Sequence, residues 1–228
     1  MLSRLLASIA AAAIASALMS CAGTPPPKYS GYLGDDYKLL KEEKDDLGAP
    51  VLRFVSPQLT PANYHSLILE PVQFYPEPRP DSQVSMGALN DIRDYLNRSI
   101  REKVGAKVNV VDKPGPGVAR FRGAITAVNA QTEALAAYQY IPIALIVTAA
   151  KDASAGGRPE DARIFAEGEV LDSVSGARLA VAVREGTGER LKQAKGGGKQ
   201  VTLDELKPVI DKWVDAFAVA ASQRIKSK

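Results

Sequence analysis

The sequence predicts an α+β fold, in which two long amphipathic helices pack on a mainly antiparallel sheet. Two stretches, 86–104 and 203–225, repeat apolar residues at the three- and four-residue steps that are typical of an amphipathic helix. Stretches typical of strands, either apolar or alternating between apolar and polar residues, are more numerous. Because the helices are too few to cross over between every pair of strands, we expect most strands to be antiparallel neighbours.

The first strands are expected on either side of residue 60. Residues 51–55 form a short apolar strand candidate, and residues 66–75 form a longer one. Pro71 lies inside the longer stretch and favours an edge strand or a bulge, because proline cannot donate to a β-ladder. The first helix should follow, with Ser85 as its N-cap and Gly105 just beyond its end. Its core-facing stripe is expected to consist of Met86, Leu89, Ile92, Leu96, Ile100 and Val104.

A hairpin is the clearest feature of the second half of the chain. Residues 107–112 and 118–128 are strand candidates that flank a Pro-Gly turn at 114–117. Residues 168–185 then predict a hairpin, since Asp172 can bond the downstream backbone and Gly176 can take a positive φ.

The C-terminal helix has a well-defined start. Thr202 and Glu205 have the spacing of a capping box, in which each side chain satisfies a free backbone N–H of the other. The stripe predicted to face the core consists of Leu206, Ile210, Trp213, Phe217, Ala221 and Ile225.

The N-terminus carries the pattern of an exported lipoprotein. Arg4 precedes an unbroken apolar run at 5–18, and small Ser20 precedes Cys21, the only cysteine. This arrangement resembles a lipobox, which implies a diacylglycerol thioether on Cys21, cleavage before it, and N-acylation with a fatty acid such as palmitate. A plain signal peptide and a buried cysteine in an N-terminal helix are the alternatives. Because Ala22 is not the Asp that tends to retain lipoproteins in the inner membrane, the sorting rule implies the outer membrane, on its periplasmic face.

The chain is expected to divide into three parts. Residues 1–20 are the signal peptide, residues 21–48 are the lipidated cysteine with a Pro-rich and charged linker, and residues 49–228 are a single α+β domain. Removing the segment with Arg4 lowers the formal charge from +3 to +2, which gives no case for nucleic acid as a partner.

Four local patterns resemble a family of uncharacterised Gram-negative lipoproteins known only as a domain of unknown function. The patterns are Ser-Gly-Tyr-Leu at 30–33, Leu-Arg-Phe-Val at 52–55, the Asp-x-Pro-Gly-Pro-Gly turn at 112–117, and Leu-Asp-Ser-Val-Ser-Gly at 171–176. The resemblance implies export, lipidation and one compact domain, and it implies no reaction. The order of elements is also similar to that of lipoprotein domains that bind envelope proteins, such as activators of peptidoglycan synthases, which is an analogy of fold alone.

The reactive side chains form no recognisable catalytic, cofactor-binding or metal-ligating set. His65 is the only histidine and has no spaced nucleophile, so we interpret it as a surface or strand-entry residue. Glu167 and Glu169 share one face of a predicted strand, where paired carboxylates can act as acid and base, but the solvated face of a sheet is the simpler interpretation. With one histidine and no thiol beyond Cys21, no metal, cofactor or enzymatic activity is expected.

Two further stretches allow a functional and a simple interpretation. One cluster of basic residues could bind an anionic surface or could simply belong to a solvated loop: Arg178, Arg184, Arg190, Lys192, Lys195 and Lys199. The apolar stretch 141–150 could line a ligand-binding site, form a protein interface or be buried in the core. The leading hypothesis is a non-enzymatic envelope lipoprotein that binds another protein, with the open backbone of the 168–185 hairpin as its edge. The alternatives are a periplasmic binder of a lipid or small apolar ligand and, third, an envelope hydrolase.

Overall fold

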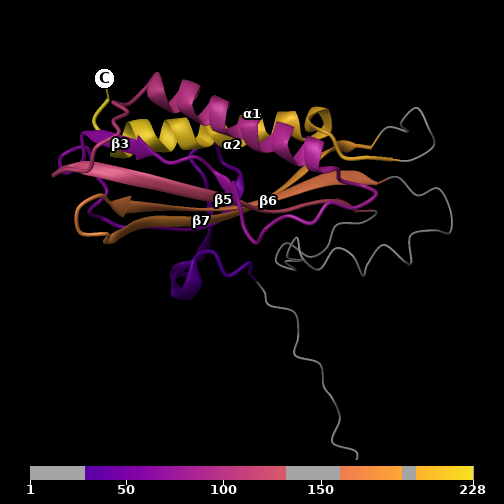
Figure 1. Ribbon diagram of the computed structural model, residues 1–228. Helices are drawn as coiled ribbons and strands as arrows, with labels where there is room; N and C mark the ends of the chain where they lie inside the picture. The colour runs from indigo at the N-terminus through magenta and orange to yellow at the C-terminus, as the bar shows by residue number, and fades with distance from the viewer. Residues whose placement is uncertain (1–28, 132–159, 192–198, 228) are drawn as a thin grey trace, which may run out of the picture.

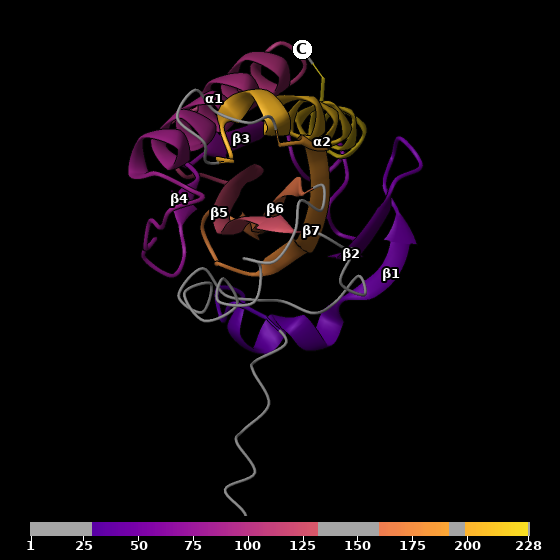
Figure 2. The same ribbon diagram turned by 90° about the vertical axis from the view of Figure 1, so that its right-hand side faces the viewer.

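The folded part of the chain is built on one seven-stranded sheet. The computed structural model describes residues 29–131, 160–191 and 199–227, and within them the strand order is β1-β2-β7-β6-β5-β3, with β4 also paired to β5 (Figures 1 and 2). The strands are β1 (Lys41–Lys44), β2 (Pro50–Val55), β3 (Ser66–Leu69), β4 (Gln73–Phe74), β5 (Val118–Gln131), β6 (Asp161–Asp172) and β7 (Arg178–Arg190).

The sheet is mixed, so the expectation of a mainly antiparallel α+β fold is confirmed only in its coarser form. The pairs from β1 through β2, β7 and β6 to β5 are antiparallel, whereas β3 and β4 run parallel to β5. Helix α1 (Met86–Gly105) causes the exception. It carries the chain from the end of β4 back to the start of β5, which makes the strands on either side of it parallel.

Helix α1 follows the sequence prediction at its start and departs from it at its end. The Ser85 hydroxyl accepts a hydrogen bond from the N–H of Ala88, as expected for an N-cap. Gly105 is the last helical residue, and the C-cap is Ala106 in the right-handed region (φ −70°), so this end needs no left-handed glycine. The predicted stripe is buried except for Met86, which is exposed in the first turn.

Helix α2 (Leu203–Arg224) begins with the predicted capping box. The backbone N–H of Thr202 donates to Glu205 Oε2 at 2.9 Å, and the Thr202 hydroxyl accepts from the first turn. The buried stripe keeps four of the six predicted residues, Leu206, Ile210, Ala221 and Ile225, and adds Val214, Ala216 and Ala218. Trp213 and Phe217 lie on its flank and are only partly buried.

Helix α2 touches the backbone of β7 near the start of the helix. A Cβ atom on Gly188 would lie 2.2 Å from the backbone oxygen of Glu205, and one on Gly186 would lie 2.5 Å from Val209 Cγ2. The two glycines therefore permit an approach that any other residue would block. Both helices lie on this face of the sheet, as Figure 2 shows.

The opposite face is covered by the N-terminal segment, which the sequence assigns to a linker. Residues 29–40 contain the short helix η1 (Gly34–Leu39) and cross this face, and β1 then joins the edge of the sheet (Figure 2). A second apolar cluster lies beneath the segment and includes Leu33, Phe165 and Val181. Folded structure thus begins by Tyr29 rather than near Ala49, because scattered aromatic and apolar residues here pack without any regular period.

The predicted hairpin is present, but its strands lie inside the sheet. The Asp172 carboxylate accepts from the N–H groups of Val174 and Ser175, and Gly176 has φ +71°, as expected for this turn. Strand β6 pairs with β5 on one side, and β7 pairs with β2 along residues 180–183. The expectation that this hairpin offers an open edge is therefore wrong for those residues.

The predicted strand 66–75 is divided at Pro71. Strands β3 and β4 lie on either side of it, along β5, as an edge position for this proline requires. Asn97 of α1 holds the interruption by donating to the carbonyl oxygen of Val72 and accepting from its N–H. Residues 107–112 form isolated bridges only, one of them from Val110 to Leu67.

Among the described residues, no helix is long and apolar enough to cross a membrane.

Candidate functional site

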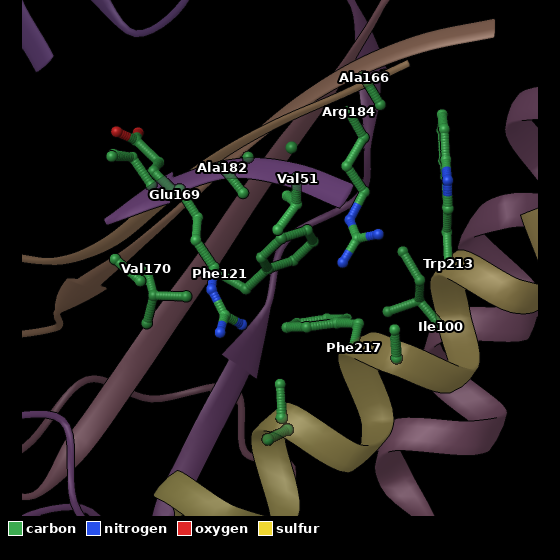
Figure 3. Close-up of a pocket in the computed structure, with 18 of the residues that line it drawn as sticks. Val51, Ile100, Phe121, Ala166, Glu169, Val170, Ala182, Arg184, Trp213 and Phe217 are labelled. Carbon is green, nitrogen blue, oxygen red and sulfur yellow. The ribbon is translucent and has the colours of Figure 1, made fainter. Parts of the chain in front are cut away.

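A cavity of about 190 Å³ lies between the sheet and the second half of α2 (Figure 3). Its floor is formed by the centres of β5, β6 and β7, where the residues that face the helix are small: Gly123, Ala166, Gly168, Ala180 and Ala182. The helix above is also small on this side, at Ala216, Ala220 and Ala221. Since glycine and alanine fill little space, the two layers leave a void where larger residues would interlock.

Three aromatic side chains form the walls of the cavity. Phe121 lies over two of the floor glycines, since a Cβ atom on Gly123 or Gly168 would be 2.9 or 3.2 Å from its ring. Its ring meets that of Phe217 with 4.6 Å between centroids and a tilt of 38°. Trp213 closes the side nearest the start of α2 (Figure 3). The glycines of β5 and β6 thus allow an aromatic ring to lie flat against the sheet.

One wall is charged, and it faces the β1–β2 turn. Arg53 Nη1 and Arg224 Nη2 each lie 3.1 Å from an oxygen of Asp46, so that Asp46 joins β2 to the end of α2. Arg184 Nη1 lies 2.7 Å from Asp45 Oδ2. The polar wall is therefore assembled from the β1–β2 turn and β2 together with two elements distant from them in sequence, β7 and the end of α2.

Asp45 lies behind this wall and is more deeply buried than Asp46. Burial by itself disfavours its charge, but the hydrogen bonds from Arg184 and from the N–H groups of Ala49 and Leu47 outweigh burial and lower the pKa of Asp45. Its carboxylate therefore stays ionised at neutral pH and holds Arg184 at the edge of the cavity.

Glu167 lies on the opposite face of the sheet and is buried, which corrects the interpretation of that face as solvated. Glu167 is only 2 % exposed, and its carboxylate accepts from the hydroxyl of Tyr37 at 2.5 Å and from the N–H of Ser30 at 3.3 Å. Burial and the hydrogen bond to Glu167 raise the pKa of Tyr37 to about 12. This carboxylate is thus committed to holding the N-terminal segment.

Glu169 is buried on the same face and is held by two arginines. It is also 2 % exposed, and it pairs with Arg122 (Nε to Oε1, 2.6 Å) and with Arg178, which in turn pairs with Asp36 of η1. The two glutamates share a face, as alternation predicts, yet each is bound by a different partner. They form anchors for residues 29–40 rather than an acid and base facing a cleft.

His65 is a strand-entry residue, as expected. It is exposed immediately before β3, with Nδ1 2.9 Å from the Ser66 hydroxyl and Nε2 3.2 Å from the carbonyl oxygen of Pro116. No group of three or more potential ligands able to hold a metal occurs within the described ranges.

The predicted basic group is not a free cationic surface where the structure describes it. Arg178 pairs with Asp36 and Glu169, Arg184 pairs with Asp45, and Arg190 lies 3.8 Å from Asp161. Lys192 and Lys195 lie outside the described residues, as do Cys21 and the apolar stretch 141–150. Sequence reasoning missed the cavity, whose only local signal is the run of small residues on the helix-facing side of three strands.

Comparison with known proteins finds a family, a sequence relative and solved structures of low similarity. The family described as protein of unknown function, DUF3313, matches residues 28–217. The uncharacterized lipoprotein YdcL of Escherichia coli K12 is 36% identical over 197 residues, which cover 86% of each chain. The PelC dodecamer from Paraburkholderia phytofirmans has 12% identity and a TM-score of 0.36 over 77% of this chain and 97% of that one. Protein XCC0632 from Xanthomonas campestris has 11% identity and a TM-score of 0.41 over 72% and 87%. The structural scores are too low to support any argument about function.

Proposed function

The chain belongs to the DUF3313 family of proteins of unknown function, and from this we propose that it is a lipoprotein of the Gram-negative cell envelope, anchored by lipid on Cys21. Two observations support the proposal: a relative at 36% identity is named a lipoprotein, and the only cysteine follows an apolar leader-like run. Ala22 favours the outer membrane, where the folded domain would face the periplasm.

Within this proposal, the domain binds a small apolar ligand in the cavity beneath α2. The observation that supports ligand binding is the cavity itself, which has a floor of glycine and alanine and three aromatic walls. An apolar cavity of roughly 150 Å³ is large enough to bind benzene in a protein interior. The cavity of about 190 Å³ is somewhat larger, and it lies between the sheet and α2, with Leu96 and Ile100 of α1 also in its lining. Small-molecule sites commonly combine such an apolar surface with a few polar groups at one side.

The positions of the side chains support binding alone better than they support a catalysed reaction. Glu167 and Glu169 are held by Tyr37, Arg122 and Arg178 on the face away from the cavity. A general base needs to reach a proton of the substrate, and these carboxylates lie on the wrong side of the sheet. We therefore propose no reaction for this domain.

Capture of another envelope protein is the competing proposal. This proposal rests on the membrane anchor, on the lack of a catalytic set and on an open edge of the β6–β7 hairpin, but β6 pairs with β5 and residues 180–183 of β7 pair with β2. A mostly apolar, partly open cavity is present instead, and it supports a small ligand. Reproducible protein partners in cells, together with an empty cavity, would reverse this preference.

The Cys21→Ser protein is expected to lose its membrane attachment completely. The thioether needs the thiol of Cys21, and the two or more acyl chains that give stable anchoring would then be absent. Fractionation of cells into membrane and soluble extracts measures the result, with Ser20→Ala as the matched control because it keeps a small residue before the cleavage point. A Cys21→Ser protein that is still processed and membrane-bound would exclude lipid on Cys21.

Filling the cavity is expected to prevent ligand binding while the domain still folds. Ala182→Leu places three further carbon atoms on the cavity floor and should lower the affinity for 1-octanol by about tenfold or more, since each buried CH₂ contributes about 0.8 kcal/mol. Trp213, the only tryptophan, lines the cavity, so its fluorescence reports the titration.

Ala177→Leu is the control for this test, because Ala177 is exposed in the turn of the same hairpin. Its affinity for 1-octanol should equal that of the unchanged chain. If 1-octanol bound the Ala182→Leu protein as tightly as the control, the ligand would lie elsewhere.

A further inference from the structure

We propose that the cavity selects a single-chain anionic amphiphile, whose head group meets Arg184 and Arg224 and whose alkyl chain lies under α2. This inference rests on the proposed ligand-binding function and adds the chemical class of the ligand. The volume of about 190 Å³ holds about six groups of the size of a water molecule, at roughly 30 Å³ each. An alkyl chain of about six to eight carbon atoms therefore suits the space.

The charge on the cavity wall favours an anion. Three guanidinium groups line the cavity, from Arg53, Arg184 and Arg224, together with the carboxylate of Asp46. The other charged groups that the cavity meets are Glu167 and Glu169, whose carboxylates are bound on the far face of the sheet, and Figure 3 shows Glu169 pointing away. The wall that a ligand would touch thus carries three positive charges and one negative charge.

Two of the carboxylates that pair with these arginines lie on the side of the guanidinium groups away from the cavity. Asp45 holds Arg184 from the β1–β2 turn, and Glu43 holds Arg53 at 2.7 Å from β1. Neither acid lines the cavity. An anion inside would meet the inner edges of the guanidinium groups, while the pairs behind keep those groups in place.

Donors remain available for a ligand on two of the arginines. A guanidinium group has five N–H donors. Within the described part of the chain, Arg184 donates from Nη1 to Asp45. Arg224 donates to Asp46, to the carbonyl oxygen of Ala220 and weakly to the side chain of Gln223.

Asp46 shows how a carboxylate is accommodated at this wall. Its oxygens lie 3.1 Å from both Arg53 and Arg224, so one carboxylate bridges two guanidinium groups. A second anion would meet the N–H donors that these bonds leave unused. Figure 3 shows Arg184 reaching from β7 toward the space between Phe121 and Trp213, where a head group would meet both charge and ring edges.

The test compares three ligands that share one alkyl chain: octanoate, 1-octanol and octylammonium. The full chain carrying Cys21→Ser is purified without detergent, which would compete for the cavity, and Trp213 fluorescence at pH 7 gives each affinity. Octanoate is expected to bind about tenfold or more tightly than 1-octanol, because a hydrogen bond to a charged group contributes more than a neutral one. Octylammonium is expected to bind more weakly than either.

Arg224→Gln should lower the affinity for octanoate much more than that for 1-octanol, and bring the two to within about threefold of each other. Arg184→Gln should act in the same direction, whereas Arg184→Lys, which keeps a positive charge opposite Asp45, should retain most of the preference for octanoate. Arg190→Gln is the control, since this side chain is 69 % exposed and does not line the cavity.

The outcomes separate this inference from the proposed function. Equal affinities for the three ligands would overturn anion selection and leave the apolar cavity as a binding site. Tighter binding of octylammonium than of octanoate would show that the negative charge of Asp46 dominates at the cavity wall, and it would also overturn the inference. Absence of binding by all three would overturn the proposed function itself.

Discussion

Gly188→Ala is expected to destabilise the domain by about 3 kcal/mol or more, at the upper end of the usual cost of overpacking. The new methyl group would lie 2.2 Å from the backbone oxygen of Glu205 and 3.0 Å from Leu206 Cδ2. A backbone atom cannot rotate away as a side chain does, so the first turn of α2 must move off β7. For a domain of this size, that loss lowers Tm by about 6–12 °C.

Thermal unfolding followed by far-UV circular dichroism measures the effect. Gly115→Ala is the matched control, because its methyl group would meet Val118 Cγ2 at 3.9 Å, an ordinary contact, and its φ is not in the left-handed region. The control should change Tm by no more than a degree or two. Equal Tm values for the two variants would show that α2 does not rest on β7 at this glycine.

Features that depend on a few neighbouring residues could be predicted from the sequence. The capping box at Thr202, the N-cap Ser85 and the turn at Asp172 each place donor and acceptor within three residues, so the sequence alone determines whether they can form. The periodicity of α1 was equally informative, because one side of this helix faces the core along most of its length.

The orientation of α2 needed information from the rest of the chain. A period of 3.6 residues identifies an apolar side but not which part of that side meets the sheet. Trp213 and Phe217 are as apolar as the buried positions, yet they lie over the small residues of β6 and β7 and border a cavity. Only the pairing of β6 with β7 places Gly168 opposite Ala182 and so creates the space that these rings surround.

The burial of Glu167 and Glu169 is the clearest failure of local reasoning. Alternation along β6 correctly places both on one face, but exposure of that face depends on what covers it. The cover is η1 and its flanking residues, about 130 positions earlier in the chain. That segment mixes tyrosines with charged residues and has no period, so the sequence resembles a linker.

Glu169→Ala is expected to cost about 2–4 kcal/mol and to release the N-terminal segment from the sheet. Removing one partner of a buried ion pair typically costs 3–5 kcal/mol because the remaining charge is left unpaired. The cost here should be lower, since the Arg122 side chain is 45 % exposed and can regain water. Arg178 keeps Asp36 but loses its acceptor in the sheet. Urea unfolding gives the free energy, and limited trypsin digestion after Lys38 reports release of the segment.

Glu70→Ala is the appropriate control, because Glu70 also pairs with an arginine of β5 but does so at the surface. Its carboxylate lies 3.4 Å from Arg120, and both side chains are about one-third exposed, so its loss should cost less than about 1 kcal/mol. Glu169→Gln removes the charge but keeps an acceptor for one arginine, and its cost should fall between the two. If Glu169→Ala were no more destabilising than Glu70→Ala, or if Lys38 stayed protected from trypsin, Glu169 would not hold the N-terminal segment. The apolar cluster around Leu33 and Phe165 would then be sufficient to keep residues 29–40 on the sheet.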